Sequence, residues 1–413
     1  MTQFLEIGSI LVKSVSHYDM PTKLKALVFK SVLIISVLLI FVGCSRVGTA
    51  QGWSGGVLVG ESLIIGSMDG QLLSLNVETG RHDWAPTLLR VDEDKDDRRA
   101  IYGTPAVYEG VAFVGSYDGK MHAYALDNGI LLETEPIADE IVGGALIEEG
   151  VLYVGSSDGF MNAFDISIRG QEVTMERKWK FQTGSSIWST PQIYENLLIF
   201  SSLDHNIYAL DLNCDTCIDE GTTKWVYETS AAVASSPLVS DGEVYIGSFD
   251  GNFYSLDAMS GTENWRFTGA SNWYWGTAVA DGNAVYAPSL NGSLYALDKS
   301  DGDLRWESKT KGAIVGSPAI VSGMIAYGSK DGDLYISELS SGIIMGTCST
   351  GEKIEAPITS DGNSVYFSVR DHSIRAIQIK GNGNPDEKWD APYFSDKAKD
   401  GEIPNPSDWA PSC

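Results

Sequence analysis

The sequence predicts an all-β fold, a single eight-bladed propeller whose blades are four-stranded antiparallel meanders. A strand-plus-turn signature, Gly-Ser-x-Asp-Gly with some variation, recurs eight times in the 413 residues. Successive copies lie 49, 40, 46, 46, 41, 40 and 40 residues apart, the length of a four-stranded blade with occasional loop insertions. The closing positions of the copies are Gly70, Gly119, Gly159, His205, Gly251, Gly292, Gly332 and His372.

A second position keeps the same register, thirteen residues before the first residue of each signature. Its occupants, called the register residues below, are Trp53, Tyr102, Val142, Trp188, Ala234, Trp275, Val315 and Glu355. A lone four-stranded unit cannot bury both faces of its sheet, so copies in register predict blades that stack against one another.

Residues 275–306 show the internal plan of one copy. Three turn dipeptides, Asp281-Gly282, Asn291-Gly292 and Asp301-Gly302, separate runs rich in Val, Tyr, Leu and Ala. Asp-Gly and Asn-Gly accept the positive φ angles of tight hairpin turns. The pattern therefore predicts four short strands joined by three turns.

Residues 1–44 precede the repeats and are expected to form a signal peptide. An apolar run over 31–43 follows three lysines, Lys23, Lys25 and Lys30, and Met20 is an alternative start. The run ends in Phe-Val-Gly-Cys-Ser, which resembles a bacterial lipobox and predicts lipidation of Cys44. An uncleaved anchor and a simple cleaved signal are the alternatives. The remaining chain divides into a tether (45–52), the propeller (53–393) and a C-terminal tail (394–413).

The charge balance restricts the class of partner. The chain carries a net charge of −26, and residues 1–44 contain four Lys and two acids, so the rest is near −28. Such a surface repels nucleic acid and anionic lipid head groups. The charge serves solubility, or it offers an acidic face to a basic protein partner.

Four cysteines remain after Cys44, an even number that suits an exported, disulfide-bonded protein: Cys214, Cys217, Cys348 and Cys413. Cys214 and Cys217 are predicted to bridge locally within a loop. Ile218 stands where a c-type haem site needs His, and no second Cys pair completes a zinc site. A bridge from Cys348 to Cys413 would tie down the tail.

A tryptophan follows the last turn glycine of several copies by four residues, as in Gly261 to Trp265 and Gly302 to Trp306. The docking tryptophans are Trp84, Trp179, Trp225, Trp265, Trp306 and Trp389. With the preceding Ser-Leu-Asp or Ala-Leu-Asp, this pattern resembles the docking motif of pyrroloquinoline-quinone-type propeller repeats. The resemblance implies that each indole packs between neighbouring blades. Glu133 and Gly346 occupy the Trp position in two copies, so these two junctions are expected to be the weakest.

Quinoprotein dehydrogenases share this repeat, and a pyrroloquinoline-quinone-dependent dehydrogenase is one alternative function. Those enzymes also use adjacent cysteines and acidic calcium ligands, whereas this sequence has no Cys-Cys pair. Its histidines show no metal-ligand spacing, and no catalytic triad or phosphate loop is evident. We therefore expect no catalytic residue, no metal and no cofactor.

A closer resemblance is to the propeller lipoproteins of the bacterial outer-membrane β-barrel assembly machinery. It implies a monomeric scaffold that binds a protein partner, exported and lipid-anchored on the outer face of the cytoplasmic membrane or on the periplasmic side of the outer membrane. The other hypothesis is a receptor for a ligand or peptide at the mouth of the propeller axis. Its candidate site is the aromatic set Trp53, Tyr102, Trp188 and Trp275. Packing of the same rings without a ligand is the alternative.

Overall fold

The computed structural model describes residues 51–89, 99–219 and 221–392. The predicted signal peptide with Met20 and Cys44, the start of the tether, and the tail with Cys413 lie outside the described residues. Within those residues, no helix has the length and hydropathy of a membrane span.

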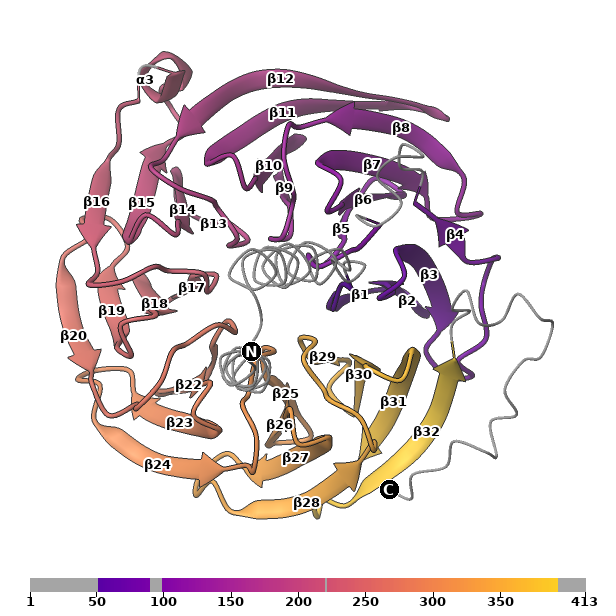
Figure 1. Cartoon of the computed structure of the whole chain (residues 1–413), viewed down its shortest axis with the longest axis vertical. Helices are drawn as coiled ribbons and strands as arrows, with labels where there is room; N and C mark the ends of the chain where they lie inside the picture. The colour runs from indigo at the N-terminus through magenta and orange to yellow at the C-terminus, as the bar shows by residue number, and fades with distance from the viewer. Residues whose placement is uncertain (1–50, 90–98, 220, 393–413) are drawn as a thin grey trace, which may run out of the picture. The chain divides into compact units, whose positions relative to one another are not determined.

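The predicted propeller is confirmed: the strands form eight sheets of four, each built from consecutive antiparallel strands. Figure 1 shows these sheets arranged as blades around a central axis. Blades 1 to 4 contain β1 (Gly56–Val59), β2 (Ser62–Gly66), β3 (Gln71–Asn76), β4 (Thr87–Leu88); β5 (Ala106–Tyr108), β6 (Val111–Gly115), β7 (Lys120–Ala125), β8 (Leu131–Pro136); β9 (Leu146–Glu148), β10 (Val151–Gly155), β11 (Phe160–Arg169), β12 (Glu172–Gln182); β13 (Gln192–Tyr194), β14 (Leu197–Ser201), β15 (Asn206–Asp211), β16 (Trp225–Glu228).

A short helix, α3 (Asp215–Asp219), interrupts blade 4 between β15 and β16. Blades 5 to 8 contain β17 (Leu238–Ser240), β18 (Glu243–Gly247), β19 (Phe253–Asp257), β20 (Glu263–Phe267); β21 (Val279–Asp281), β22 (Ala284–Pro288), β23 (Ser293–Asp298), β24 (Leu304–Lys309); β25 (Ala319–Val321), β26 (Met324–Gly328), β27 (Asp333–Glu338), β28 (Ile344–Ser349); β29 (Thr359–Ser360), β30 (Ser364–Val369), β31 (Ser373–Ile379), β32 (Pro385–Pro392).

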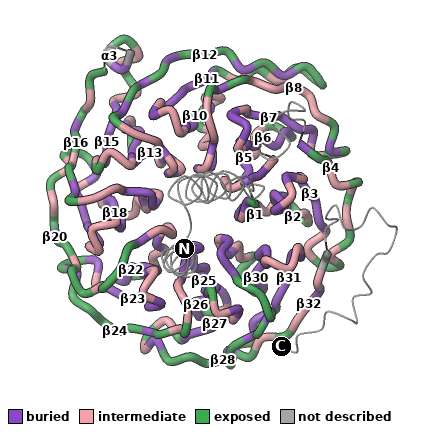
Figure 2. The backbone as a smooth tube through the Cα atoms, in the orientation of Figure 1, coloured by how far each residue is buried: buried purple, intermediate pink, exposed green. Residues whose placement is uncertain are grey.

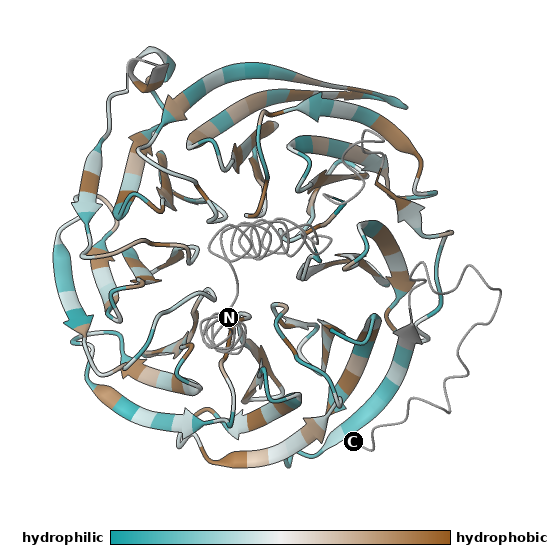
Figure 3. Cartoon of the chain, in the orientation of Figure 1, coloured by the Kyte–Doolittle hydropathy of each residue, from teal (hydrophilic) through white to brown (hydrophobic). Residues whose placement is uncertain are grey.

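The hydrophobic core lies between the blades. The second and third strands of each blade are almost wholly buried, as in β14 and β22. The outer strands alternate, as β12 does, with Trp179 facing inward among exposed polar residues. Figure 2 shows this division, with exposed residues concentrated on the outer strands, and Figure 3 shows β12 and β32 as mostly hydrophilic. Each blade therefore buries both faces of its sheet only because a neighbouring blade packs against each face.

An indole hydrogen bond joins one blade to the next at five junctions. In each, Nε1 donates to a backbone carbonyl of the following blade: Trp84 to Leu126 (3.0 Å), Trp225 to Ala258 (3.0 Å), Trp265 to Lys299 (2.8 Å), Trp306 to Leu339 (2.9 Å) and Trp389 to Val77 (2.9 Å). The ring lies directly on the turn glycine of that blade. At Gly302, where φ is +77°, an added Cβ would stand 2.5 Å from Trp265. The turn therefore needs glycine both for its backbone conformation and for space.

The ring closes without exchange of strands, because β1–β4 form blade 1 and β29–β32 form blade 8. At the closing junction Trp389 docks on blade 1, and the Thr359 hydroxyl accepts from Gly56 N (3.1 Å) and donates to Gly56 O (2.9 Å). His372 adds a contact from its Nδ1 to Asp69 Oδ2 at 3.0 Å.

The remaining three junctions depart from the indole pattern. At the junction of blades 3 and 4, Trp179 is 3% exposed and packs in one cluster with Ile218 of α3. At the junction of blades 7 and 8, a Cβ on Gly346 would stand 2.4 Å from Gly383 O, so the outer strands approach closely there. A cluster that includes Phe367 and Cys348 fills the space behind them.

The junction at Glu133 is covered by a long hairpin of blade 3. Strands β11 and β12 have 10 and 11 residues and extend past the other blades' strands, and β12 contacts β8 of blade 2. Val173 and Met175 of the hairpin are buried in the same cluster as Phe113 of blade 2. An added apolar layer thus replaces the missing indole.

The turn between the second and third strands has a positive φ at its closing position in every blade, from 65° at His372 to 94° at Gly332. The two histidines at this position, His205 (φ 79°) and His372, therefore share the left-handed conformation of the six glycines.

We expect Trp389→Ala to lower the free energy of unfolding by about 3 to 5 kcal/mol, because it empties the only indole site at the closing junction among the described blades. Trp273, whose side chain is 49% exposed, is the matched control, and Trp273→Ala should cost under about 1.5 kcal/mol. Urea unfolding, with midpoint and slope analysed separately, measures both. Equal losses would show that docking does not hold the ring closed.

His205→Gly should stabilise the protein slightly. The left-handed conformation costs an ordinary residue about 1 to 2 kcal/mol, and glycine avoids this cost. Glycine also loses more backbone entropy on folding, which offsets about 0.5 to 1 kcal/mol of the gain. The expected net gain is up to about 1 kcal/mol in the same urea experiment. His372→Gly should gain less, because it also loses the contact with Asp69. A larger gain at His372 would contradict this account.

Candidate functional site at the axial mouth

The eight register residues line one cavity at one end of the propeller axis, with a volume of about 150 Å³. Each comes from the loop that enters the first strand of its blade. The sequence-predicted aromatic set is thus brought together: Trp53, Tyr102, Trp188 and Trp275 all border this space, which we call the axial mouth. The non-aromatic members Val142, Ala234, Val315 and Glu355 complete the circle.

In several blades the residue before the register residue anchors the loop. In blade 2 this residue is Ile101, which is fully buried, and a Cβ on Gly66 of blade 1 would stand 2.5 Å from its side chain. In the same way, a Cβ on Gly155 of blade 3 would stand 2.2 Å from the side chain of Ile187 of blade 4. Where the signature begins with glycine, that glycine therefore leaves room for the next blade's anchor, and the anchor turns the register residue toward the axis.

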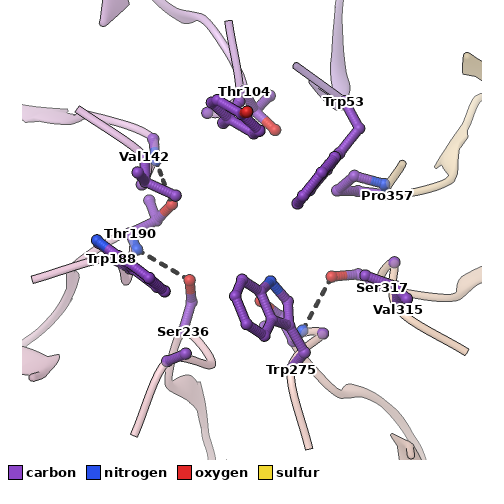
Figure 4. Close-up of a pocket in the computed structure, with 18 of the residues that line it drawn as sticks. Trp53, Thr104, Val142, Trp188, Thr190, Ser236, Trp275, Val315, Ser317 and Pro357 are labelled. Atoms are coloured by element: carbon purple, nitrogen blue, oxygen red, sulfur yellow. Dashed lines mark hydrogen bonds between the residues drawn. The ribbon is translucent and has the colours of Figure 1, made fainter. Parts of the chain in front are cut away.

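Hydroxyl groups behind the register residues link neighbouring blades. Thr190 Oγ1 accepts from Gly144 N at 2.8 Å, and Thr190 N donates to Ser236 Oγ at 2.8 Å. Ser317 Oγ accepts from Thr277 N at 3.0 Å. These bonds, drawn in Figure 4 for Thr190 and Ser317, satisfy backbone amides around the mouth and make its wall rigid.

The aromatic rings form two groups across the mouth. Trp53 and Tyr102 meet edge to face, with centroids 4.8 Å apart. On the other side Trp188 lies 5.7 Å from Trp275, which also stacks on Phe249. Figure 4 shows the rings of Trp53, Trp188 and Trp275 around the open centre. The mouth therefore presents pre-placed aromatic surfaces.

Glu355 brings charge to one side of the mouth. It is 6% exposed and forms ion pairs with Lys330 (Nζ to Oε1, 2.8 Å) and with Arg370 Nε. Burial raises the pKa of this carboxyl, but the two ion pairs outweigh burial and hold the pKa below its ordinary value. The guanidinium of Arg370 also lies over the Trp53 ring, 5.4 Å from its centroid. This triad carries one more positive than negative charge.

Several neighbours of the mouth could not be found from the sequence. Lys330 and Arg370 occupy the third position of the signature in the last two copies, but nothing in the repeat pairs them with Glu355. Phe249 also stacks on Trp273, with ring centroids 4.6 Å apart. Tyr274, between Trp273 and Trp275, is fully buried between blades and takes no part in the mouth.

The structure tests the cysteine predictions only in part. Cys214 and Cys348 are each disulfide-bonded. The side chain of Cys217 and all of Cys413 lie outside the described residues, so the pairings Cys214–Cys217 and Cys348–Cys413 remain predictions. Across the described residues, no group of three or more His, Cys, Asp or Glu side chains is arranged to hold a metal ion.

Comparison with known proteins gives one curated relative, the outer membrane protein assembly factor BamB of Alkalilimnicola ehrlichii. It is 31% identical over 83 residues, which are 20% of this chain and 22% of the relative, so the match spans about a fifth of the relative's length.

Two solved structures share the fold, each aligned over 81% of this chain. The computationally designed Ika8 protein aligns over 98% of its own chain with a TM-score of 0.65 and 14% identity. BamB from Moraxella catarrhalis aligns over 96% of its chain with a TM-score of 0.62 and 19% identity.

The family is decided by a wider match. The family model described as outer membrane protein assembly factor BamB matches residues 52–190, 215–272 and 250–345. These ranges cover more than half of the chain: blades 1, 2, 3, 5 and 6, most of blade 7 and the last strand of blade 4. The chain therefore belongs to the BamB family of eight-bladed propellers.

Proposed function

We propose that this chain is a non-catalytic, membrane-tethered scaffold of outer-membrane protein assembly, and that it binds a protein partner through the axial mouth. The observation that carries the proposal is the convergence of four aromatic register residues and Arg370 on one rigid opening, in a chain of the BamB family. Trp, Tyr and Arg are the residues most enriched among those that dominate protein–protein binding energy.

The size of the mouth favours a protein partner over a small molecule. Pockets for ligands of drug size have volumes of about 300 to 1,000 Å³. The mouth has about 150 Å³, enough for one or two inserted side chains. A partner that rests on the rim and inserts such side chains uses the aromatic surfaces fully.

A receptor for a small ligand or a free peptide is the second candidate. The stack of Phe249, Trp273 and Trp275 at the rim favours it, because flat ligands bind well on offset aromatic rings. The two functions predict that different molecules co-purify with the chain: a protein subunit for the scaffold, and a small ligand or free peptide for the receptor.

Affinity capture from detergent-solubilised membranes tests the scaffold, with captured proteins identified by mass spectrometry. The parent should recover a subunit of the barrel-assembly machinery. Trp188→Ala with Trp275→Ala should weaken this recovery at least about tenfold, since truncated hot-spot residues cost about 2 kcal/mol or more each.

Ile130→Ala with Leu304→Ala is the matched control, because both side chains are apolar and exposed (53% and 48%) away from the mouth. Recovery should be unchanged in this control. If the mouth variant also captures the subunit normally, the mouth is not the interface. Recovery of a small molecule alone would favour the receptor.

We also propose that Cys44 carries the tether, which rests on the lipobox resemblance. Cys44→Ser should yield either unprocessed precursor or a soluble form in fractionated cells, while the parent stays with the membranes. Inhibition of lipoprotein signal peptidase should change the mobility of the parent. A parent that fractionates as a soluble protein would refute the anchor.

A further inference from the structure

A second, larger cavity lies away from the axial mouth, with a volume of about 480 Å³. Its walls come from the turn between the first and second strands of blades 1 and 2, the end of β7, and the hairpin tip Gly170-Gln171 of blade 3. The register residues precede the first strands, and these turns follow them. In an antiparallel meander the two sets lie at opposite ends of a blade, so this cavity opens on the face opposite the mouth.

The floor of this cavity is apolar. It is formed by Val59, Ile64, Val111, Leu126 and Leu132 from blades 1 and 2. Ile64 and Val111 belong to the two cores on either side of blade 2 and are 1% and 3% exposed, so the floor is fixed. The volume is about three times that of the axial mouth, so it admits several side chains.

The third wall exists because of the hairpin that covers the Glu133 junction. Arg169 pairs with Glu172 across the turn Gly170-Gln171, and the hairpin is held in place by buried Val173 and Met175. The tip is therefore part of a packed structure, and the cavity is largely pre-formed.

The rim is acidic. Glu109 and Asp127 are exposed and border the cavity, and its lining residues include no Lys or Arg. Ser62 on the same rim donates to Asp83 Oδ2 at 2.8 Å, which places a third carboxylate beside it. Glu61 and Glu149 occupy the equivalent turns of blades 1 and 3 and are also exposed. Against these carboxylates the hairpin tip contributes one guanidinium, Arg169.

We propose that this cavity is a docking site for a peptide segment of a partner that carries large apolar side chains flanked by Lys or Arg. Charge complementarity selects this occupant: the apolar floor takes the side chains, and Glu109 and Asp127 pair with the flanking cations. Anionic lipids and acidic peptides are repelled by the same rim. The site goes beyond the proposed scaffold function, since it uses another face of the propeller and names the chemistry of the segment that binds there.

The test is fluorescence anisotropy with the full chain and a short labelled peptide that carries Leu-Phe flanked by lysines. Saturable binding is expected, weakening as salt rises. Glu109→Gln with Asp127→Asn should weaken it at least about fivefold, from two partly screened ion pairs of about 0.5 kcal/mol or more each. The same peptide with glutamates in place of lysines should not bind.

The matched control is Glu195→Gln with Asp281→Asn, which removes the same charge from the first turns of blades 4 and 6, the turns equivalent to that of Glu109. Glu195 and Glu109 share a left-handed backbone, with φ of 53° and 44°. The control should change affinity less than about twofold. Equal weakening in both double variants would mean that the whole acidic surface attracts the peptide, and the proposal would fail.

Gln171→Trp tests the apolar part by filling the cavity from the exposed hairpin tip. Binding should be lost with the melting temperature unchanged. Trp188→Ala with Trp275→Ala should bind the peptide normally, which separates this site from the axial mouth. Unchanged binding in Gln171→Trp, or no saturable binding to the parent, would overturn the proposal.

Discussion

The ring depends on one contact repeated around it, an indole of one blade lying on the glycine turn of the next. The contact combines burial of a large aromatic surface with a hydrogen bond from Nε1 to a backbone carbonyl, so it is both strong and directional. Its two halves lie on different blades, as with Trp265 and Gly302. A blade is therefore complete only when its neighbours are present. Because no strand is exchanged at closure, Trp389 and the turn at Val77 join the two ends of the chain by the same means.

Junctions without this contact are where the structure departs from its repeat. Glu133 leaves a space that the long hairpin of blade 3 covers, and the hairpin tip then forms a wall of the acidic cavity. Gly346 instead allows β28 and β32 to approach closely. Loss of a repeated stabilising residue is thus accompanied by a local structure of a different kind, and in blade 3 that structure also creates a binding surface.

The axial mouth and the cavity on the opposite face differ in chemistry. At the axial mouth, aromatic rings surround a small opening, and the triad of Glu355, Lys330 and Arg370 carries a net positive charge. On the opposite face, acidic side chains occupy the first turns of most blades, including Glu109, Glu195 and Asp281. Two such sites would let one chain hold two different segments at once, which suits the proposed scaffold better than a single-site receptor.

The periodic pattern of the sequence is enough to predict the blade count, the turns and the gathering of the register residues. Equivalent positions in a closed repeat must lie at equivalent distances from the axis, so Trp53 and Trp275 had to meet at one mouth although they are far apart in the chain. The left-handed conformation of His205 and His372, which share a turn position with six glycines, was found only in the structure. Which unlike residues meet across blades became known from the folded chain. The ion pairs of Glu355, the packing of the hairpin over the Glu133 junction and the contact of Trp179 with α3 join segments that differ from one repeat to the next. Such contacts depend on side-chain packing between blades, which a periodic pattern does not encode.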